Sequence, residues 1–374
     1  MDADRRFMRM ALRLAARGAG LASPNPMVGA VLVRDGRAIA TGWHRGPGLP
    51  HAEASALAAA GAAASGCDLF VNLEPCCHVE KKTPPCVPAI VAAGVRRVVV
   101  AMEDPNPAVS GRGLAQLRAR GLEVATGVLE ADARRLNAAF GTYITTGRPH
   151  VTLKLATTLD GRIAARDGSS RWVSSEASRL AVQRMRAIAD CVLVGSGTAC
   201  GDDPLLLPRG VRVRRPPLRA VLDSDARLSA SSQLARTTDR GPVLVAVAAD
   251  APAARAAALS AAGVEVVRLP RGPGGVSLPA LLDLLGRRGV TSALVEGGAA
   301  VAATLVRDGL ADRVVLFLAA MLLADPAARP WCDDLGLRTL PDAVRFEVER
   351  VTRVGPDLRV DLVRAAAGGA GPPG

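Results

Sequence analysis

The feature that most restricts how this chain can fold is a set of metal-ligand residues that lie far apart in the sequence. His51 comes first, Cys76 follows Pro75, and Cys86 comes last. Thiolates and a neutral imidazole are preferred ligands of Zn²⁺. A fold that lets them bind one ion must bring all three together. Because three protein ligands leave the fourth tetrahedral position for water, the set predicts a catalytic zinc site rather than a structural one.

A carboxylate accompanies this set. Glu53 lies two residues after His51, at the start of an Ala/Leu-rich run, 52–60, that predicts a helix. Side chains two apart on a helix do not share a face, so we expect Glu53 to point toward a substrate rather than to bind the metal. The order His-x-Glu, Pro-Cys, Cys resembles the signature of zinc deaminases, in which the metal activates water and the glutamate is the acid/base. Glu53 is therefore the candidate catalytic residue.

Other cysteines and a histidine near this set leave alternatives open. Cys77 could replace Cys76 as a ligand, although the residue directly after proline is the usual one. His78 could be a fourth ligand, which would displace the water, and we favour a substrate contact for it. The remaining cysteines are expected to be reduced and buried like small apolar side chains, namely Cys67, Cys191, Cys200 and Cys332.

Composition limits the classes of partner. The net charge of +12 favours a nucleic-acid partner at first sight. However, the only lysines are Lys81, Lys82 and Lys154, and an arginine excess in an Ala- and Gly-rich chain is typical of nucleotide bias in a genome. Three Trp, one Tyr and five Phe also offer few surfaces for stacking bases, so no nucleic-acid partner is predicted. No apolar run reaches the roughly 18 residues of a membrane span, and we expect a soluble, cytoplasmic protein.

The chain of 374 residues predicts two α/β domains. We place the boundary in the segment 145–149, which gives a first domain at 1–146, a second at 147–366 and a disordered Ala/Gly/Pro tail at 367–374. The predicted helices of the first domain are 6–17, 52–60, 87–93, 113–120 and 131–140, and its predicted strands are 28–33, 69–73, 95–101 and 123–126. Strand-like runs in the second domain predict a mostly parallel or mixed sheet, at 151–156, 191–194, 220–222, 243–248, 264–269, 293–295 and 314–318.

Two glycine-rich turns follow predicted strands of the second domain. Glu296-Gly297-Gly298 leads into a predicted helix, 300–307, whose first N–H groups can hold a phosphate. A second turn, Gly195-Ser196-Gly197-Thr198, follows another strand. Neither is the Gly-x-Gly-x-x-Gly fingerprint, which disfavours an ordinary Rossmann domain. Two such turns favour an extended phosphate-bearing ligand, and Trp172 either packs in the core or contacts its ring.

Longer motifs extend the likeness to a whole family. They are Pro24-Asn25-Pro26-Met27-Val28-Gly29, His51-Ala52-Glu53, Leu73-Glu74-Pro75-Cys76, Thr83-Pro84-Pro85-Cys86, Glu103-Asp104-Pro105-Asn106-Pro107, Leu159-Asp160-Gly161 and Glu296-Gly297-Gly298. In this order the chain resembles the bifunctional deaminase/reductase family of riboflavin biosynthesis over roughly residues 6–363. General nucleoside and tRNA deaminases instead carry Pro-Cys-x-x-Cys.

The resemblance implies a cytidine-deaminase-like first domain that hydrolyses the 2-amino group of 2,5-diamino-6-ribosylamino-4-pyrimidinone 5′-phosphate. It implies a dihydrofolate-reductase-like second domain that uses NADPH to convert the ribosyl group to ribityl, and a homo-oligomer. Zn²⁺ would be bound by His51, Cys76 and Cys86. The implied substrate contacts are Asn25, His78, Ser170, Arg186, Leu206, Arg209 and Glu296. The implied NADPH contacts are Ala156, Trp172, Thr198, Asp202, Ser224, Gly298, Ala299, Ala300, Val301, Ala302, Ala303 and Thr304.

Two segments depart from the family pattern. The loop 79–82 is one residue longer than usual and lacks its glycine, and the run from Ala320 to Ala324 replaces Pro-x-Leu-Leu-Gly.

The main alternative to a bifunctional enzyme is a monofunctional zinc deaminase with a nucleotide-binding regulatory second domain. A binding protein with a structural zinc and an RNA-binding surface is the third possibility.

Overall fold

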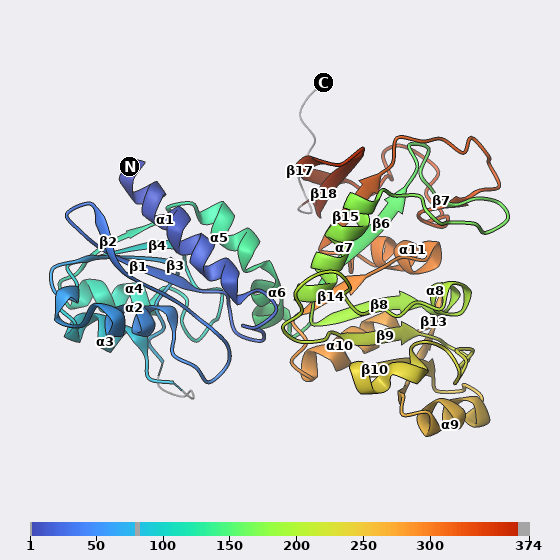
Figure 1. Cartoon of the computed structure of the whole chain (residues 1–374), viewed down its shortest axis with the longest axis horizontal. Coiled ribbons are helices and arrows are strands. Elements are labelled where there is room, and N and C mark those ends of the chain that lie inside the picture. The colour runs from blue at the N-terminus through green and yellow to red at the C-terminus, as the bar shows by residue number, and fades with distance from the viewer. Residues whose placement is uncertain (1, 79–82, 366–374) are drawn as a thin grey trace. The chain divides into compact units, whose positions relative to one another are not determined.

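The computed structural model describes residues 2–78 and 83–365, which form two compact units (Figure 1). Unit 1 holds the residues up to Pro149 together with Gly286–Thr291, and unit 2 holds His150–Leu285 and the residues from Ser292 onward. Each unit has a sheet with helices on it, so the predicted α/β class is confirmed. The loop 79–82 and the predicted tail 367–374 lie outside the described residues.

Unit 1 is built on a five-stranded sheet with the order β2-β1-β3-β4-β5. β1 is antiparallel to β2 and β3, whereas β3, β4 and β5 are parallel. The central strands are buried along nearly their whole length because helices cover both faces. The strands are β1 (Gly29–Arg34), β2 (Arg37–Trp43), β3 (Asp68–Leu73), β4 (Arg97–Met102) and β5 (Glu123–Thr126).

The helices of unit 1 form two layers around this sheet (Figure 1). One face is covered by α1 (Asp2–Ala15) and α5 (Glu130–Leu136), and the other by α2 (Ala52–Ala60), α3 (Cys86–Ala92) and α4 (Arg112–Ala119). Two 3₁₀ turns, Ala16–Gly18 and Gly61–Ala64, extend α1 and α2.

One predicted helix of unit 1 was wrong in its extent. The run 131–140 is divided between α5 and α6 (Ala138–Thr146), with the break at Asn137. The Asn137 side chain accepts a hydrogen bond from Met27 N (2.8 Å) and donates one to Met27 O (3.0 Å). The backbone hydrogen bonds continue through Asn137, from its N–H to Ala133 O and from Gly141 N to its O, and the break is a local departure of its backbone to φ −101° and ψ 21°. The local apolar pattern does not reveal it.

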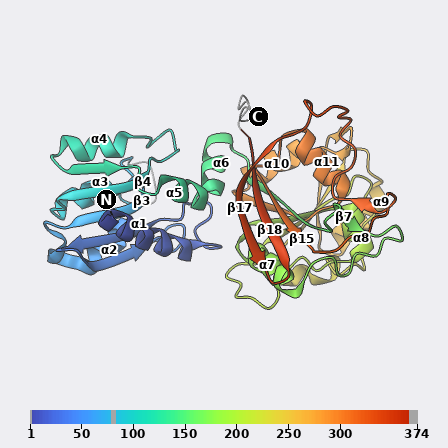
Figure 2. The ribbon, with the colours of Figure 1, turned by 90° about the horizontal axis from the view of Figure 1, so that it is seen from above.

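Unit 2 is built on a nine-stranded sheet with the order β11-β10-β9-β8-β14-β6-β15-β18-β17. The strands from β11 to β15 in this order are parallel, and β18 and β17 are antiparallel to their neighbours, which confirms the predicted mixed sheet. Figure 2 shows β15, β18 and β17 side by side. The strands are β6 (His150–Thr157), β8 (Cys191–Gly195), β9 (Leu218–Leu222), β10 (Val243–Ala248), β11 (Glu265–Leu269), β14 (Ser292–Val295), β15 (Arg313–Leu318), β17 (Phe346–Val354) and β18 (Asp357–Arg364).

The remaining elements of unit 2 connect and cover this sheet. The helices are α7 (Glu176–Ile188), α8 (Ser196–Asp202), α9 (Ala253–Ala261), α10 (Leu278–Arg287) and α11 (Ala299–Arg307), with a 3₁₀ segment at Ala235–Arg240. Two short antiparallel pairs are β7 (Arg162–Ala164) with β16 (Arg329–Pro330) and the hairpin of β12 (Arg271–Gly272) with β13 (Gly275–Val276). The turn predicted at Gly195–Thr198 is instead the start of α8, because the chain turns directly from β8 into the helix.

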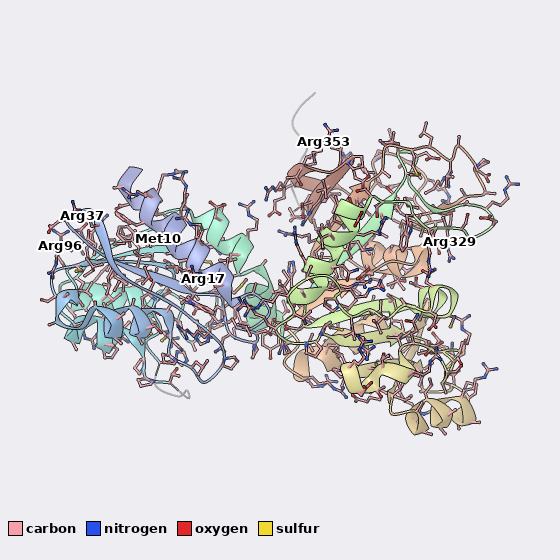
Figure 3. All side chains as sticks on the ribbon, in the orientation of Figure 1. Met10, Arg17, Arg37, Arg96, Arg329 and Arg353 are labelled. Carbon is pink, nitrogen blue, oxygen red and sulfur yellow. The ribbon has the colours of Figure 1, made fainter. Side chains whose placement is uncertain are left out.

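Exposed arginines occur in both units. They are Arg37 on β2, Arg96 in the loop before β4, Arg329 on β16 and Arg353 on β17 (Figure 3). Within the described ranges, none of the helices has the length and apolar character that crossing a bilayer requires.

The cysteine prediction was partly wrong. Cys67 and Cys191 are fully buried as expected, whereas Cys200 is exposed on α8 and Cys332 is half-buried in a loop. The sequence around these two cysteines does not show that their segments lie at the surface.

Candidate active sites

The first candidate site begins where α2 meets β2. Gly42 on β2 allows this contact, because a Cβ atom there would lie 2.1 Å from Ala52 O and 2.7 Å from Ala56 N. His51 precedes the helix as its N-cap residue, and Glu53 lies in the first turn. The close packing of α2 on the sheet therefore fixes both side chains relative to the ends of the neighbouring strands.

His51, Cys76 and Cys86 converge into one group whose ligand atoms all lie within 4.8 Å of one another. His51 Nδ1 is 3.4 Å from Cys76 Sγ and 3.3 Å from Cys86 Sγ. Zinc bonds of about 2.0–2.3 Å at a tetrahedral centre require N–S separations of roughly 3.5 Å. The group therefore fits a zinc ion bound by one nitrogen and two sulfurs.

Two local contacts hold this group in place. Thr83 Oγ1 is 3.0 Å from His51 Nε2, which leaves Nδ1 to face the cysteines. The backbone N–H of Cys86, the first residue of α3, donates to Cys76 O at 3.0 Å. The ends of β3 and α3 are thus tied together at the two sulfur ligands.

Cys77 and His78 lie beside the group but do not join it in the described part of the chain. Burial, followed by the charge of Glu74, raises the pKa of the Cys77 thiol, which disfavours the thiolate that a metal needs. His78 lines the adjoining cavity, and its buried Nδ1 has no hydrogen-bond partner among the described residues. The structure therefore brings Cys76, not Cys77, to the candidate metal position.

Glu53 is buried beside the sulfur ligands, with 3% of its surface exposed. Burial, followed by the neighbouring Cys76, raises the pKa of this carboxyl group. A raised pKa favours the protonated form, which suits a group that holds a proton and returns it. The position and the environment of Glu53 suit proton transfer in the cavity that it lines.

The cavity next to this group has a volume of about 510 Å³. The predicted substrate contact Asn25 lines it and donates from Nδ2 to His44 Nε2 at 3.0 Å. His44 and Asp104, which the sequence reasoning did not assign, also line it. Burial raises the pKa of Asp104 to about 6 and lowers that of His44. The Glu103–Pro107 motif was the available signal for Asp104.

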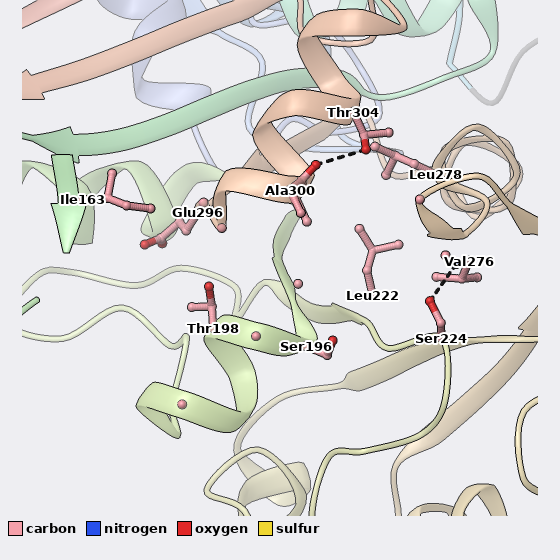
Figure 4. A pocket seen from close by; sticks show the side chains of 18 of the residues that line it. Ile163, Ser196, Thr198, Leu222, Ser224, Val276, Leu278, Glu296, Ala300 and Thr304 are labelled. Atoms are coloured by element: carbon pink, nitrogen blue, oxygen red, sulfur yellow. Dashed lines mark hydrogen bonds between the residues drawn. The ribbon is translucent and has the colours of Figure 1, made fainter. Parts of the chain in front are cut away.

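The second candidate site is a cavity of about 880 Å³ in unit 2, at the carboxyl ends of its parallel strands (Figure 4). Ligands of open parallel sheets bind at this edge. Ten of the predicted NADPH and substrate residues line it, namely Ala156, Ser170, Thr198, Asp202, Ser224, Glu296, Gly298, Ala300, Val301 and Thr304.

Seven other predicted residues of unit 2 are not part of this lining. Ala299, Ala302 and Ala303 are buried because α11 turns them toward the core. Trp172 is 64% exposed, and the Arg179 guanidinium carbon lies 4.4 Å from the centroid of its ring. The other three are Arg186, Leu206 and Arg209.

A glycine turn shapes the wall of this cavity. Gly297 and Gly298 have φ angles of 68° and 86°, which favour glycine, and they join β14 to α11. The start of α11 has no side-chain cap, so its N–H groups suit a phosphate. On the opposite side, Ser224 Oγ accepts a bond from Val276 N at 2.8 Å (Figure 4). The cavity therefore offers phosphate-binding groups at the start of α11.

A buried charge cluster joins two residues of the lining, Lys154 and Glu296, to Arg186, which is outside the lining. Arg186 donates two hydrogen bonds to the Glu296 carboxylate, and Lys154 Nζ lies 3.2 Å from Glu296 Oε2. Burial acts to raise the pKa of Glu296, but Lys154 and Arg186 lower it to about 2. Lys154 was missed in the sequence, where its rarity as one of three lysines was the only signal.

These two sites define a class: an α/β zinc deaminase joined to a reductase with a dihydrofolate-reductase-like fold. Residues 1–102 match the family described as cytidine and deoxycytidylate deaminase zinc-binding region, and residues 149–360 match the RibD C-terminal domain. The second match disfavours the alternative of a purely regulatory second domain. The chain belongs to the RibD family of bifunctional riboflavin biosynthesis enzymes, whose cofactors are zinc and NADPH.

Individual relatives match along almost the whole chain. Riboflavin biosynthesis protein RibD of Aquifex aeolicus is 38% identical over 363 residues, 97% of this chain and 99% of that protein. The protein of the same name from Escherichia coli is 38% identical and is covered completely, with 97% of this chain matched. The solved structure of Acinetobacter baumannii RibD, form 1, has a TM-score of 0.85 at 34% identity and covers 98% of this chain and 99% of that one.

A further solved structure carries a descriptive name. The Thermotoga maritima diaminohydroxyphosphoribosylaminopyrimidine deaminase/5-amino-6-(5-phosphoribosylamino)uracil reductase has a TM-score of 0.84 at 34% identity. It matches over 97% of this chain and 99% of that one.

Proposed function

We propose that this chain catalyses two consecutive steps of riboflavin biosynthesis on one pyrimidine phosphate. The first is hydrolytic removal of the 2-amino group of 2,5-diamino-6-ribosylamino-4-pyrimidinone 5′-phosphate, assigned to residues 1–146. The second is NADPH-dependent reduction of the ribosyl group to ribityl, assigned to residues 147–366. The observation that carries the proposal is the convergence of His51, Cys76 and Cys86 beside Glu53 in one cavity.

In the first step, His51, Cys76 and Cys86 would hold zinc, which supplies the Lewis acidity that makes a water molecule nucleophilic near neutral pH. Glu53 takes a proton from that water and delivers it to a ring nitrogen. It then takes the second proton from the added oxygen and delivers it to the 2-amino group, which leaves as ammonia. Its buried carboxyl group is suited to holding the proton between these transfers. Asn25 and His78 contact the substrate from the cavity wall.

In the second step, NADPH supplies the hydride, and the protein positions the two reactants. The turn before α11 and the residues Thr198 and Ser224 bind the cofactor from opposite walls of the cavity. Glu296, held ionised by Lys154 and Arg186, contacts the sugar of the substrate. Lys154 lies beside Ala156 in the lining and is placed to donate a proton to an oxygen of the opening sugar ring.

The remaining predicted contacts complete the proposal. For NADPH they are Ala156, Trp172, Asp202 and the segment from Gly298 to Thr304, and for the substrate they are Ser170, Arg186, Leu206 and Arg209. The guanidinium group of Arg209 suits a 5′-phosphate because it can bind through two bonds, whereas that of Arg186 already donates two bonds to Glu296. We further propose that the protein is a homo-oligomer in the cytoplasm. Light scattering of the purified chain tests the oligomeric state.

The proposal is tested with the purified full chain, the diamino pyrimidine phosphate and NADPH. Ammonia release measures the first step, and loss of the nicotinamide absorbance measures the second. Replacing Glu53→Gln should keep the zinc content but reduce ammonia release by about 10²–10⁴-fold, while NADPH oxidation on the deaminated intermediate continues. Retained ammonia release would exclude this role of Glu53. Absence of NADPH oxidation by the wild type would exclude the reductase assignment.

A further inference from the structure

Glu74 is a buried carboxylate beside the candidate zinc site. It belongs to the Leu73–Cys76 motif, but neither that motif nor the proposed mechanism assigns it a role. It directly follows β3 and lies two residues before Cys76. Only 3% of its surface is exposed. Its backbone N–H donates to Met102 O at 3.0 Å, which extends the pairing of β3 with β4. Glu74 is therefore fixed to the same segment that carries a metal ligand.

The Glu74 carboxylate accepts hydrogen bonds from four backbone N–H groups. Oε2 accepts from Asp104 (3.1 Å) and Gly111 (2.9 Å). Oε1 accepts from Gly113 (2.8 Å) and Leu114 (3.2 Å). Bonds from N–H groups to a carboxylate are charge-assisted and roughly twice as strong as neutral ones.

Two of these N–H groups belong to the first turn of α4. The first N–H groups of a helix have no partner within it, and the N-cap residue Gly111 has no side chain that could serve. Glu74 supplies the missing acceptor from a distant part of the chain. Gly113 permits this approach, because a Cβ atom there would lie 2.2 Å from Pro75 O and 3.0 Å from Glu74 Oε1.

The other two N–H groups lie near the ends of the loop between β4 and α4. Inside this loop, Asp104 Oδ1 accepts a bond from Asn106 N at 2.9 Å, and Asn106 Oδ1 accepts one from Ala108 N at 3.0 Å. Asp104 and Asn106 both line the 510 Å³ cavity. The loop is thus anchored at both ends by Glu74 and braced internally by its own side chains.

We propose that Glu74 is a positioning residue for the deamination. It ties the cavity wall formed by Asp104 and Asn106 to the segment that carries Cys76, so that the substrate and the metal ligands keep one relative geometry. This inference rests on the proposed deamination in this cavity. Loss of the Glu74 carboxylate moves the wall but leaves the metal ligands and the reductase of the same chain in place.

The test is the full chain with Glu74→Gln. The amide keeps the size of the side chain but turns an NH₂ donor toward two N–H groups that need an acceptor. The deamination kcat/KM should fall about 100-fold, mostly through KM, because a wall displaced by about 1 Å misplaces the substrate. Zinc content and NADPH oxidation should match the wild type. The matched control is Glu103→Gln, which removes the same charge from an exposed residue of the same loop and should leave the deamination KM unchanged.

Amide hydrogen exchange provides a measurement that does not depend on catalysis. The N–H groups of Asp104, Gly111, Gly113 and Leu114 should exchange slowly in the wild type and faster in the variant, with the amides of β1 and β3 unaffected. If Glu74→Gln does not fold, Glu74→Asp keeps the charge on a shorter side chain and should show the same pattern to a smaller extent.

Three results would overturn the positioning role. They are a wild-type KM in Glu74→Gln, an equal loss of zinc and of both activities, and failure of both variants to fold. The last two would assign Glu74 to folding. A wild type that does not deaminate would instead refute the proposed function, and the exchange rates of the four amides would still decide whether Glu74 fixes the loop.

Discussion

Arg186 forms a two-bonded ion pair with Glu296, a residue that lines the unit 2 cavity, and Nη2 of Arg186 donates to Oε2 of Glu296 at 2.9 Å. Lys154 Nζ lies 3.2 Å from the same carboxylate oxygen. One carboxylate therefore balances two cations, and all three side chains are largely shielded from solvent. In this arrangement Glu296 compensates buried positive charge in addition to its proposed contact with the substrate.

Replacing Glu296→Gln leaves Arg186 and Lys154 without their compensating charge. Removal of one partner from a buried ion pair costs about 3–5 kcal/mol, so urea unfolding should show a loss of this order in the unfolding free energy of unit 2. NADPH oxidation should fall sharply while ammonia release continues. Asp334→Asn, at the exposed Arg338–Asp334 pair, is the control and should change neither property. Unaltered stability in Glu296→Gln would contradict the compensating role.

The same cluster predicts how stability depends on pH. The pKa of Glu296 is about 2 in the folded protein and has an ordinary value of 4.5. Because the folded value is lowered, the stabilisation by the ionised carboxylate is complete above pH 4.5 and is lost as the pH falls toward 2. The difference in unfolding free energy between wild type and Glu296→Gln should be constant from neutral pH to about 4.5 and then shrink. A difference that titrates near neutrality would contradict this assignment.

Cys76 and Cys77 are neighbours, but the structure gives them different surroundings. Cys76 Sγ lies 3.4 Å from His51 Nδ1, whereas burial and then Glu74 raise the pKa of Cys77. Cys76→Ser should therefore lose zinc, and Cys77→Ser should retain the wild-type content, as measured by atomic absorption. The two variants are controls for each other, since each removes one sulfur from the same segment. Zinc loss in Cys77→Ser alone would reverse the ligand assignment.

Thr83 orients the imidazole of His51 through the 3.0 Å contact of its Oγ1 with Nε2. Valine has nearly the same shape but no hydroxyl group, so Thr83→Val should weaken zinc affinity about 10–100-fold without removing a ligand. Competition with a chelator measures this change. Thr126→Val, at the exposed end of β5, should have no effect. Equal affinities in the two variants would show that Thr83 does not orient the ring.

The sequence was sufficient for residues whose roles follow from local pattern. His51, Glu53, Cys76 and Cys86 lie at a helix start, a strand end and a second helix start, and these positions are visible in the motif spacing. Lys154 was missed because it lies within a strand, β6, that the sequence predicts only as an apolar run. Its contact with Glu296 depends on the pairing of β6 with β14, which no local pattern specifies.

The orientation of the proposed cofactor segment, residues 298–304, is a second feature that the sequence does not specify. Family likeness implied an unbroken run from Gly298 to Thr304, but α11 places only part of this run on the cavity wall. Gly298, Ala300, Val301 and Thr304 line the cavity, whereas the helical period turns the other alanines toward the core. The orientation of a helix about its own axis is set by packing, and an alanine-rich run contains little information about it.

Ala324 is the last residue of the run 320–324, where the family pattern has a glycine. Its backbone has a φ angle of 52°. The N–H of Ala324 donates to Asp160 Oδ2 at 3.0 Å, so the left-handed conformation is held by a tertiary contact. This conformation costs a residue other than glycine roughly 1–2 kcal/mol. The backbone entropy that glycine loses on folding costs about 0.4–1 kcal/mol more than that of alanine. Ala324→Gly should therefore raise the unfolding free energy of unit 2 by about 1 kcal/mol.

Ala327→Gly is the matched control for this prediction. Ala327 is exposed three residues further along and does not have a positive φ angle. Glycine at this position relieves no strain, so Ala327→Gly should lower the unfolding free energy of unit 2 by about 0.5–1 kcal/mol. Urea unfolding of both variants should thus give changes of opposite sign. Destabilisation by both substitutions would show that the strain at Ala324 is too small to outweigh the entropy of the added glycine.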